Sequence, residues 1–319
     1  MAQKAYGGVG GKARNGIALY CGVNGKARKV VKGYVGVNGK ARQFWGARGW
    51  RRETDIPYNM MEGCAVAYHD KIHIFGGNAS DVRRNHYSWD GEVWRQETDI
   101  PIDMTYPSVV VYEDKIHLFH GWNHYTWQEV GNAGAWNQLN NLPGYPNYAN
   151  IVGNNHAVVL NGKLTLLSSN ASNYGWWRYV CVWNENADDW VLSNVIGNWN
   201  YQTATAYNNL AYLMGGSGGD NRPYLIWDGS AISEGGYIGY NFQYGSTVVY
   251  NDKVHLLGTQ AGSEENNKRH SAFDGSTFAD KTKLPYPFYR GSACVFRGKI
   301  HIFGGMYNIH QTEHWSYEE

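Results

Sequence analysis

The sequence has little charge, no long hydrophobic run and no closely spaced cysteines. Only 17% of its 319 residues are charged, against roughly 25% in typical soluble domains, while it contains 40 Gly, 25 Tyr and 14 Trp. No stretch approaches the ~18 uncharged apolar residues that span a bilayer, and the N-terminus lacks the apolar core of a secretion signal. We therefore expect a turn-rich all-β protein that is neither membrane-inserted nor exported through a signal peptide.

The first 48 residues lack acidic side chains altogether. They contain ten Lys or Arg, whereas residues 49–319 hold 18 basic and 27 acidic side chains. Such asymmetry often marks an arm that binds nucleic acid, a membrane surface or an acidic protein. A Lys-Ala-Arg triplet recurs every 14 residues, and its basic side chains are Lys12, Arg14, Lys26, Arg28, Lys40 and Arg42.

Asn-Gly pairs at residues 24–25 and 38–39 predict two-residue hairpin turns in this arm. The arm has neither a recognition helix nor the aromatic stacking platform of nucleic-acid modules, which disfavours nucleic acid as its partner. We therefore interpret residues 1–48 as a β-repeat attachment arm that docks on other proteins or on further copies of this chain.

The remainder of the chain repeats a strand pattern six times. The first copy, residues 70–77, reads Asp-Lys-Ile-His-Ile-Phe-Gly-Gly. Five more copies follow at intervals of 43 to 48 residues, beginning at Asp114, Gly162, Asn209, Asp252 and Gly298. Each copy follows an apolar run that ends in a turn, and each leads to a third strand and a fourth. Four strands per unit at this period predict the blades of a β-propeller.

The sixth unit lacks a fourth strand, since the sequence ends at Glu319 soon after the third. Residues 50–57, WRRETDIP, repeat residues 94–101, WRQETDIP, which belong to the fourth strand of the first unit. We therefore predict that the strand opening this domain completes the last blade and closes the ring at six blades, because closure removes exposed sheet edges.

The aromatic-flanked units with diglycines at residues 76–77, 215–216 and 304–305 resemble kelch repeats, over residues 49–319. The resemblance implies a six-bladed kelch-like propeller preceded by the small β-repeat arm. The 14-residue units of the arm resemble N-terminal repeats of tail-associated proteins in phages and prophages of Gram-positive bacteria. Three of the six units depart from the diglycine pattern, so no subfamily's function is carried over.

Cysteines and histidines show no metal or redox site. Eight of the twelve histidines occupy two positions of the repeat, His73, His117, His255 and His301 in the second strand and His86, His124, His270 and His314 in the third. Equivalent positions in different blades are separated by whole sheets, so we expect structural histidines, no metal and no cofactor. The cysteines lack paired spacing and are predicted to be reduced, buried thiols; they are Cys21, Cys64, Cys181 and Cys294.

The sequence also shows no known set of catalytic residues. Some kelch propellers are copper oxidases with a Cys–Tyr crosslink, and other propellers are sialidases with three arginines, but neither set is evident. The adjacent carboxylates at residues 188–189 and 264–265 are predicted to be solvated. We therefore expect a protein that is not an enzyme.

A candidate ligand site lies where the first strand of each unit begins. The residue at this mouth position is Glu62, Tyr106, Asn154, Tyr201, Tyr244 and Arg290 in successive units. A mixed polar and aromatic ring suits the hydroxyls and stacking faces of sugars. The alternative is that the tyrosines merely cover the hydrophobic ends of the blades.

Together these features predict a component of a phage virion or phage-tail-like particle, made in the bacterial cytoplasm. Residues 1–48 would dock on tail, baseplate or fibre proteins, and the propeller would bind a host cell-surface glycan or receptor. Two alternatives stay open: a purely structural or protein-binding propeller, and an enzyme that acts on polysaccharide.

Overall fold

The chain divides into two compact units. One comprises residues 1–51 with 318–319, and the other comprises residues 52–317. The computed structural model describes residues 20–23, 26–29, 33–37, 40–45, 49–131, 133–142, 155–172, 175–187, 189–196, 203–216, 223–305, 309 and 311–319.

The arm contains two antiparallel hairpins, formed by β1 (Tyr20–Val23) with β2 (Lys26–Lys29) and β3 (Gly33–Val37) with β4 (Lys40–Trp45). Val23 pairs with Lys26 and Val37 pairs with Lys40, so two residues separate the strands of each hairpin. These registers confirm the hairpins predicted at the two Asn-Gly pairs. Lys12 and Arg14 lie outside the described residues.

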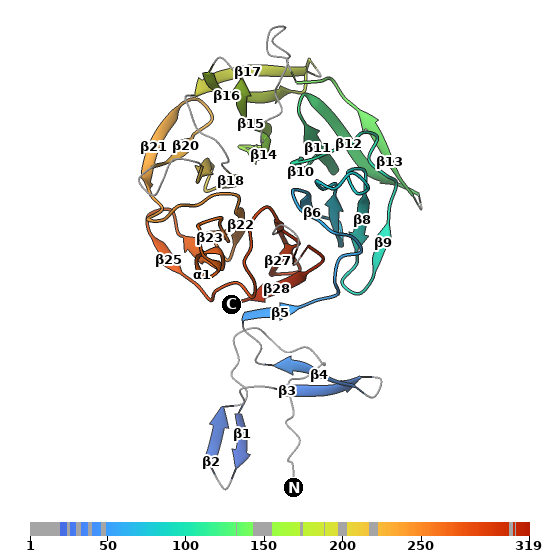
Figure 1. Cartoon of the computed structure of the whole chain (residues 1–319), viewed down its shortest axis with the longest axis vertical. Helices are drawn as coiled ribbons and strands as arrows, with labels where there is room; N and C mark the ends of the chain where they lie inside the picture. Colours follow the sequence, from blue (N-terminus) through green and yellow to red (C-terminus); the bar gives the residue numbers. More distant parts are fainter. Residues whose placement is uncertain are drawn as a thin grey trace. The chain divides into compact units, whose positions relative to one another are not determined.

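Six four-stranded sheets form the blades of a propeller around a central axis (Figure 1). Blade 1 is β6 (Cys64–Tyr68), β7 (Lys71–Phe75), β8 (His86–Trp89) and β9 (Trp94–Gln96); blade 2 is β10 (Ser108–Tyr112), β11 (Lys115–His120), β12 (Asn123–Val130) and β13 (Ala133–Gln138); blade 3 is β14 (Asn155–Leu160), β15 (Lys163–Ser172), β16 (Gly175–Asn184) and β17 (Asp189–Ile196). Blade 4 is β18 (Thr203–Tyr207), β19 (Leu210–Met214), β20 (Pro223–Trp227) and β21 (Ile232–Tyr237); blade 5 is β22 (Ser246–Tyr250), β23 (Lys253–Leu257), β24 (His270–Phe273) and β25 (Phe278–Asp280); blade 6 is β26 (Ser292–Phe296), β27 (Lys299–Phe303), β28 (His314–Glu318) and β5 (Gly49–Arg52).

Strands from both ends of the propeller sequence close the ring. β5 is the outer neighbour of β28 in blade 6, as predicted. Beyond β5, the amide N of Glu53 donates to the carbonyl O of His314 at 2.9 Å, and Ser316 Oγ donates to Glu53 Oε1 at 2.6 Å. Ile56 follows, only 3% exposed, within a cluster that includes Trp89 of blade 1.

The hydrophobic core lies between the faces of adjacent blades. Trp127 of blade 2 is fully buried and meets Tyr68 of blade 1 at a ring separation of 5.9 Å. The diglycines allow loops to approach closely: a Cβ at Gly76 would lie 2.7 Å from the carbonyl O of Met104, and one at Gly304 would lie 2.1 Å from that of Met60. Both glycines also have positive φ, which disfavours any larger residue.

The recurring histidines form buried pairs within single blades. In each pair Nδ1 of the second-strand histidine lies 2.8 to 2.9 Å from Nε2 of the third-strand histidine; the pairs are His73–His86, His117–His124, His255–His270 and His301–His314. Burial lowers the pKa of His73 to about 2 and that of His86 to about 3. These residues are structural, as the sequence indicates.

The side chains of three of the four cysteines are described, and all three are buried and unpaired as predicted: Cys64, Cys181 and Cys294. In the described ranges no three His, Cys, Asp or Glu side chains gather in a way that could hold a metal ion. The helix α1 (Glu264–Asn267) has four residues, and no helix in the described part of the chain is long and apolar enough to cross a membrane.

Candidate functional site

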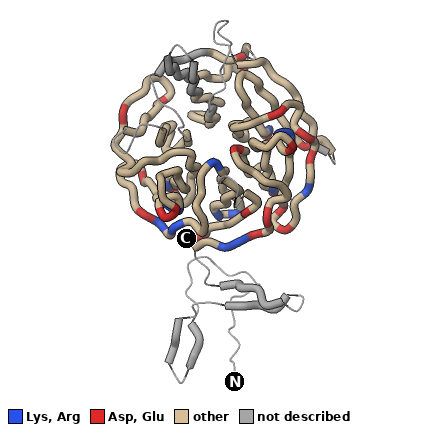
Figure 2. The backbone as a smooth tube through the Cα atoms, in the orientation of Figure 1, with Lys and Arg blue, Asp and Glu red and all other residues tan. Residues whose placement is uncertain are grey.

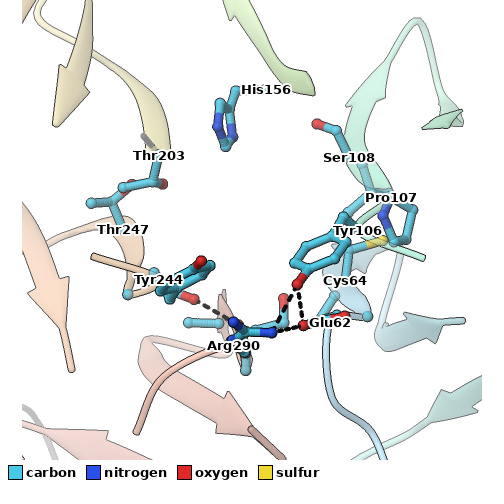
Figure 3. Close-up of a pocket in the computed structure, with 18 of the residues that line it drawn as sticks. Glu62, Cys64, Tyr106, Pro107, Ser108, His156, Thr203, Tyr244, Thr247 and Arg290 are labelled. Atoms are coloured by element: carbon cyan, nitrogen blue, oxygen red, sulfur yellow. Dashed lines mark hydrogen bonds and ion pairs between the residues drawn. The ribbon is translucent and has the colours of Figure 1, made fainter. Parts of the chain in front are cut away.

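A polar pocket of about 220 Å³ lies at the end of the propeller axis where the innermost strands begin (Figure 3). Every blade contributes to its lining, which includes Glu62, Cys64, Tyr106, Ser108, His156, Thr203, Tyr244, Thr247 and Arg290. Most Lys, Arg, Asp and Glu positions of the propeller lie away from the axis (Figure 2). The charges at this pocket therefore stand in an otherwise neutral surrounding.

Three side chains from adjacent blades form a hydrogen-bonded cluster on one wall of the pocket (Figure 3). The carboxylate of Glu62 accepts hydrogen bonds from the hydroxyl of Tyr106 and from Nη1 of Arg290. Nη1 of Arg290 also donates to Oη of Tyr106 at 3.0 Å. The side chain of Glu62 is 1% exposed and that of Arg290 is 26% exposed. A buried carboxylate is thus neutralised by a cation that still reaches solvent.

Tyr244 completes the described part of the cluster. The guanidinium carbon of Arg290 lies 4.3 Å from the centroid of the Tyr244 ring, a cation–π contact that fixes the plane of the guanidinium. Arg290 carries five N–H donors, and its side-chain hydrogen bonds among the described residues use Nη1 alone. With respect to the described residues, Nε and Nη2 are therefore available to a ligand oxygen.

The four described mouth residues share a left-handed backbone. Their φ angles are 63° for Glu62, 52° for Tyr106, 54° for Tyr244 and 58° for Arg290. Their amides form a belt between blades: Glu62 N donates to Arg290 O, Tyr106 N to Glu62 O and Arg290 N to Tyr244 O, at 2.7 to 2.8 Å. A left-handed conformation costs a non-glycine residue roughly 1–2 kcal/mol. Nine other non-glycine residues of the described chain have the same backbone, in the turns between the first and second strands of the blades, for example His69 and Arg297. The left-handed backbone is thus a feature of the repeat, and at the mouth it places the four side chains at one pocket.

Tyr106 and Arg290 both keep their protons at neutral pH, because the pKa of each is raised. Burial, followed by the hydrogen bond to Glu62 and its negative charge, raises the pKa of Tyr106. Burial opposes the charge on Arg290, but Tyr106 and Glu62 outweigh burial and raise the pKa of its guanidinium. Tyr106 is therefore a protonated hydrogen-bonding phenol, not a phenolate nucleophile.

Small hydroxyl side chains form much of the remaining wall. Thr203 Oγ1 and Thr247 Oγ1 lie 2.7 Å apart and join blades 4 and 5. Ser108 Oγ accepts a hydrogen bond from the amide N of Ala157 at 2.7 Å, and Ser246 Oγ donates to the carbonyl O of Gly291 at 3.0 Å. Each hydroxyl makes one hydrogen bond to a neighbouring blade. Its remaining donor or acceptor positions can therefore bind a ligand hydroxyl.

The sequence alignment correctly brings Glu62, Tyr106, Tyr244 and Arg290 to one pocket, while Asn154 and Tyr201 lie outside the described residues. The alignment does not reveal that the side chains of Glu62, Tyr106 and Arg290 form hydrogen bonds with one another. It also misses Ser108 and Thr247, which lie two and three residues after mouth positions. Their place at the start of an innermost strand, close to an aligned mouth residue, is the signal that could have found them.

Comparison with known proteins shows the fold. Neither a scan against protein-family models nor a search of curated proteins finds a match. Among solved structures the chain is similar to YjhT, with 11% sequence identity and a TM-score of 0.66, covering 82% of this chain and 94% of that chain. The protein is a six-bladed kelch-like β-propeller. Because 249 solved chains match, the fold alone does not specify a function.

Proposed function

We propose that the propeller binds a sugar of a host cell-surface glycan in the central pocket, as part of a phage or phage-tail-like particle to which residues 1–48 attach it. The observation that carries the binding proposal is the cluster of Glu62, Tyr106, Tyr244 and Arg290, which come from four blades and meet in one pocket. Their hydrogen bonds and the cation–π contact hold a guanidinium beside an aromatic ring in that pocket.

The size and chemistry of the pocket favour a sugar ring. Its volume of about 220 Å³ is below the roughly 300–1,000 Å³ of drug-sized ligand sites, which favours one ring over a longer segment. The wall offers the free N–H groups of Arg290, the hydroxyls of Ser108 and Thr247 and the ring of Tyr244. Planar donors, hydroxyls and an aromatic face are the groups that match sugar hydroxyls and C–H surfaces.

The same chemistry argues against hydrolysis. Glycoside hydrolysis generally uses two carboxyl groups that flank the bond, about 5–9.5 Å apart. Glu62 is the one carboxylate among the described lining residues, and both Tyr106 and Arg290 bond to it. We therefore propose that the central pocket binds the glycan without cleaving it.

A retention assay separates the functional classes. Purified full-length protein is incubated with bacterial cell-wall polysaccharide; a lectin retains the polymer, an enzyme shortens it, and a decorating protein ignores it. Arg290→Lys keeps the positive charge beside Glu62 but lacks Nε and Nη2, so we expect reduced retention. The matched control is Arg297→Lys, because Arg297 also lies over an aromatic ring, Phe296, and pairs with Asp70 but does not line the pocket.

Attachment through the arm rests on the basic repeats and is tested separately. Deleting residues 1–48 should leave a propeller that retains polysaccharide but is missing from assembled particles. A deletion variant found on particles at normal occupancy would contradict the attachment role and leave the glycan proposal intact.

A further inference from the structure

Blade 5 carries a second polar pocket. This Arg269 pocket has a volume of about 390 Å³ and lies between the loop that leads into β22 and the loop that joins β23 to β24. Its lining is Gly239, Tyr240, Asn241, Thr259, Gln260, Ala261, Gly262, Asn266 and Arg269.

One loop contributes residues to both pockets. The loop into β22 lines the Arg269 pocket with Asn241 and reaches the central pocket at Tyr244. Thr259 holds this segment: it is fully buried, its Oγ1 donates to the carbonyl O of Asn241 at 2.8 Å, and the same oxygen accepts from the amide N of Gln243 at 2.9 Å. The two pockets are therefore lined by residues only three positions apart in one loop, Asn241 and Tyr244.

Arg269 is oriented but weakly paired. Its guanidinium carbon lies 4.0 Å from the centroid of the Tyr240 ring, and Tyr240 Oη is held 2.8 Å from Ser271 Oγ. The carboxylate of Asp280 is 3.7 Å from Nε of Arg269, beyond hydrogen-bond distance, and its side chain is 74% exposed. In the central pocket, by contrast, Arg290 contacts the buried carboxylate of Glu62 directly.

The other lining groups add polarity without negative charge. Among the described residues, the lining holds one guanidinium and no carboxylate. The nearby acids of α1 are paired elsewhere, Glu264 with Lys268 at 2.7 Å and Glu265 with Lys283. Oδ1 of Asn241 is buried and has no hydrogen-bond partner among the described residues.

We propose that the Arg269 pocket binds an oxyanion on the glycan unit next to the sugar in the central pocket, either the carboxylate of a uronic acid or a phosphodiester. This inference rests on the proposed function of the central pocket and narrows it to acidic glycans. The chemistry is that of a fixed guanidinium fork, which presents parallel N–H groups to two oxygens of one anion.

The test uses full-length protein and three defined probes: an oligomer of galacturonic acid, an oligomer of glycerol phosphate and a neutral oligomer of galactose. We expect wild type to bind one acidic probe at least tenfold more tightly than the neutral probe. Arg269→Gln should lose that difference and keep its affinity for the neutral probe. Arg297→Gln, which removes a ring-stacked arginine outside both pockets, should match wild type.

The possible results distinguish failure of the Arg269 pocket from failure of both proposals. Equal affinities of wild type and Arg269→Gln for both acidic probes overturn the Arg269 pocket and leave the central pocket standing if the neutral probe binds. Failure of wild type to bind any probe overturns both proposals. If Arg269→Gln does not fold, Arg269→Lys serves instead, since it keeps the charge and lacks the fork. The preferred acidic probe identifies the anion as carboxylate or phosphodiester.

Discussion

At the residue scale, substitutions of Tyr244 distinguish the effect of its left-handed backbone on stability from the effect of its aromatic ring on ligand binding. Glycine is usually about 0.5–1 kcal/mol less favourable than alanine within a strand, but Tyr244 has a φ of 54°, where alanine is strained. We therefore expect Tyr244→Gly to be more stable than Tyr244→Ala by about 1 kcal/mol, measured by urea denaturation. The matched position is Val249, an exposed residue of β22, where alanine should be the more stable substitution.

The same two variants test the binding role of the Tyr244 ring. If Tyr244 is a central anchor, both should lose about 1–3 kcal/mol of polysaccharide binding, as buried interface aromatics do. Tyr244→Gly gives the cleaner measurement because it leaves the left-handed backbone unstrained. Unchanged affinity in this variant would remove Tyr244 from the ligand site and leave it a structural ring beneath Arg290.

We expect the two neutral substitutions of the Glu62–Arg290 pair, Arg290→Gln and Glu62→Gln, to lower the free energy of unfolding by different amounts. Arg290→Gln leaves a carboxylate whose side chain is 1% exposed without a cation, whereas Glu62→Gln leaves a guanidinium that is 26% exposed. Breaking a buried pair costs about 3–5 kcal/mol when an uncompensated charge remains buried. We expect Arg290→Gln to approach that range and Glu62→Gln to cost clearly less, by thermal and urea unfolding. Equal losses would mean that solvent reaches Glu62.

Repeat alignment predicts which side chains reach the central pocket, but not how they interact. Each mouth residue is found by its place before an innermost strand, which is local information. Glu62 and Arg290 are 228 residues apart, and their contact exists only because the ring closes. The left-handed backbone is equally hidden, since Glu, Tyr and Arg are not residues that normally indicate it.

At the scale of single elements, the buried histidine pairs predict loss of stability in acid. Burial lowers the pKa of His124, His301 and His314 to about 3 in the folded protein, whereas an unfolded histidine titrates near 6.5. Between these values the unfolded chain binds more protons than the folded chain. Stability is therefore full above about pH 6.5 and falls as the pH drops toward 3, by about 1.4 kcal/mol per pH unit for each histidine.

Urea midpoints measured from pH 7.5 to 4.5 check this slope. His73→Gln/His86→Gln should flatten the profile, because two histidines that protonate on unfolding are gone. His69→Gln is the control, since the hydrogen bond to Asp114 raises the pKa of this exposed histidine and its loss should not flatten the slope. A profile parallel to wild type for the double variant would show that the pair does not stay neutral in the folded blade.

At the scale of the whole molecule, the fold was predictable because a propeller is built from local pairings. Apart from β5, which pairs with β28, each strand of the propeller pairs with a chain neighbour, so one repeated hairpin motif predicts the first five blades and three strands of the sixth. The contacts within the histidine pairs, by contrast, could not be predicted from the repeat. Their two repeat positions are evident, but their contact depends on register: Phe75 pairs with His86, and that register brings His73 close enough to His86 for a hydrogen bond.

Ring closure gives the last prediction. Deleting residues 49–57 removes β5 and leaves β28 as an exposed outer edge of blade 6. The deletion also removes the partners of His314 and Ser316 at Glu53, and the buried side chain of Ile56. Exposed edges promote pairing between chains, so we expect aggregation or a broad, less cooperative melting transition.

Two further variants show whether aggregation and loss of cooperativity come from the missing strand β5, from the missing arm or from lost core packing. Deleting residues 1–48 keeps β5 and should leave the melting of the propeller unchanged. Ile56→Ala keeps every strand but opens a cavity beneath the closing segment, which should cost about 2–5 kcal/mol without aggregation. If the chain without residues 49–57 remains a monomer and melts at the temperature of the full-length protein, then the first five blades with the remaining three strands are stable alone, and β5 does not hold the ring closed.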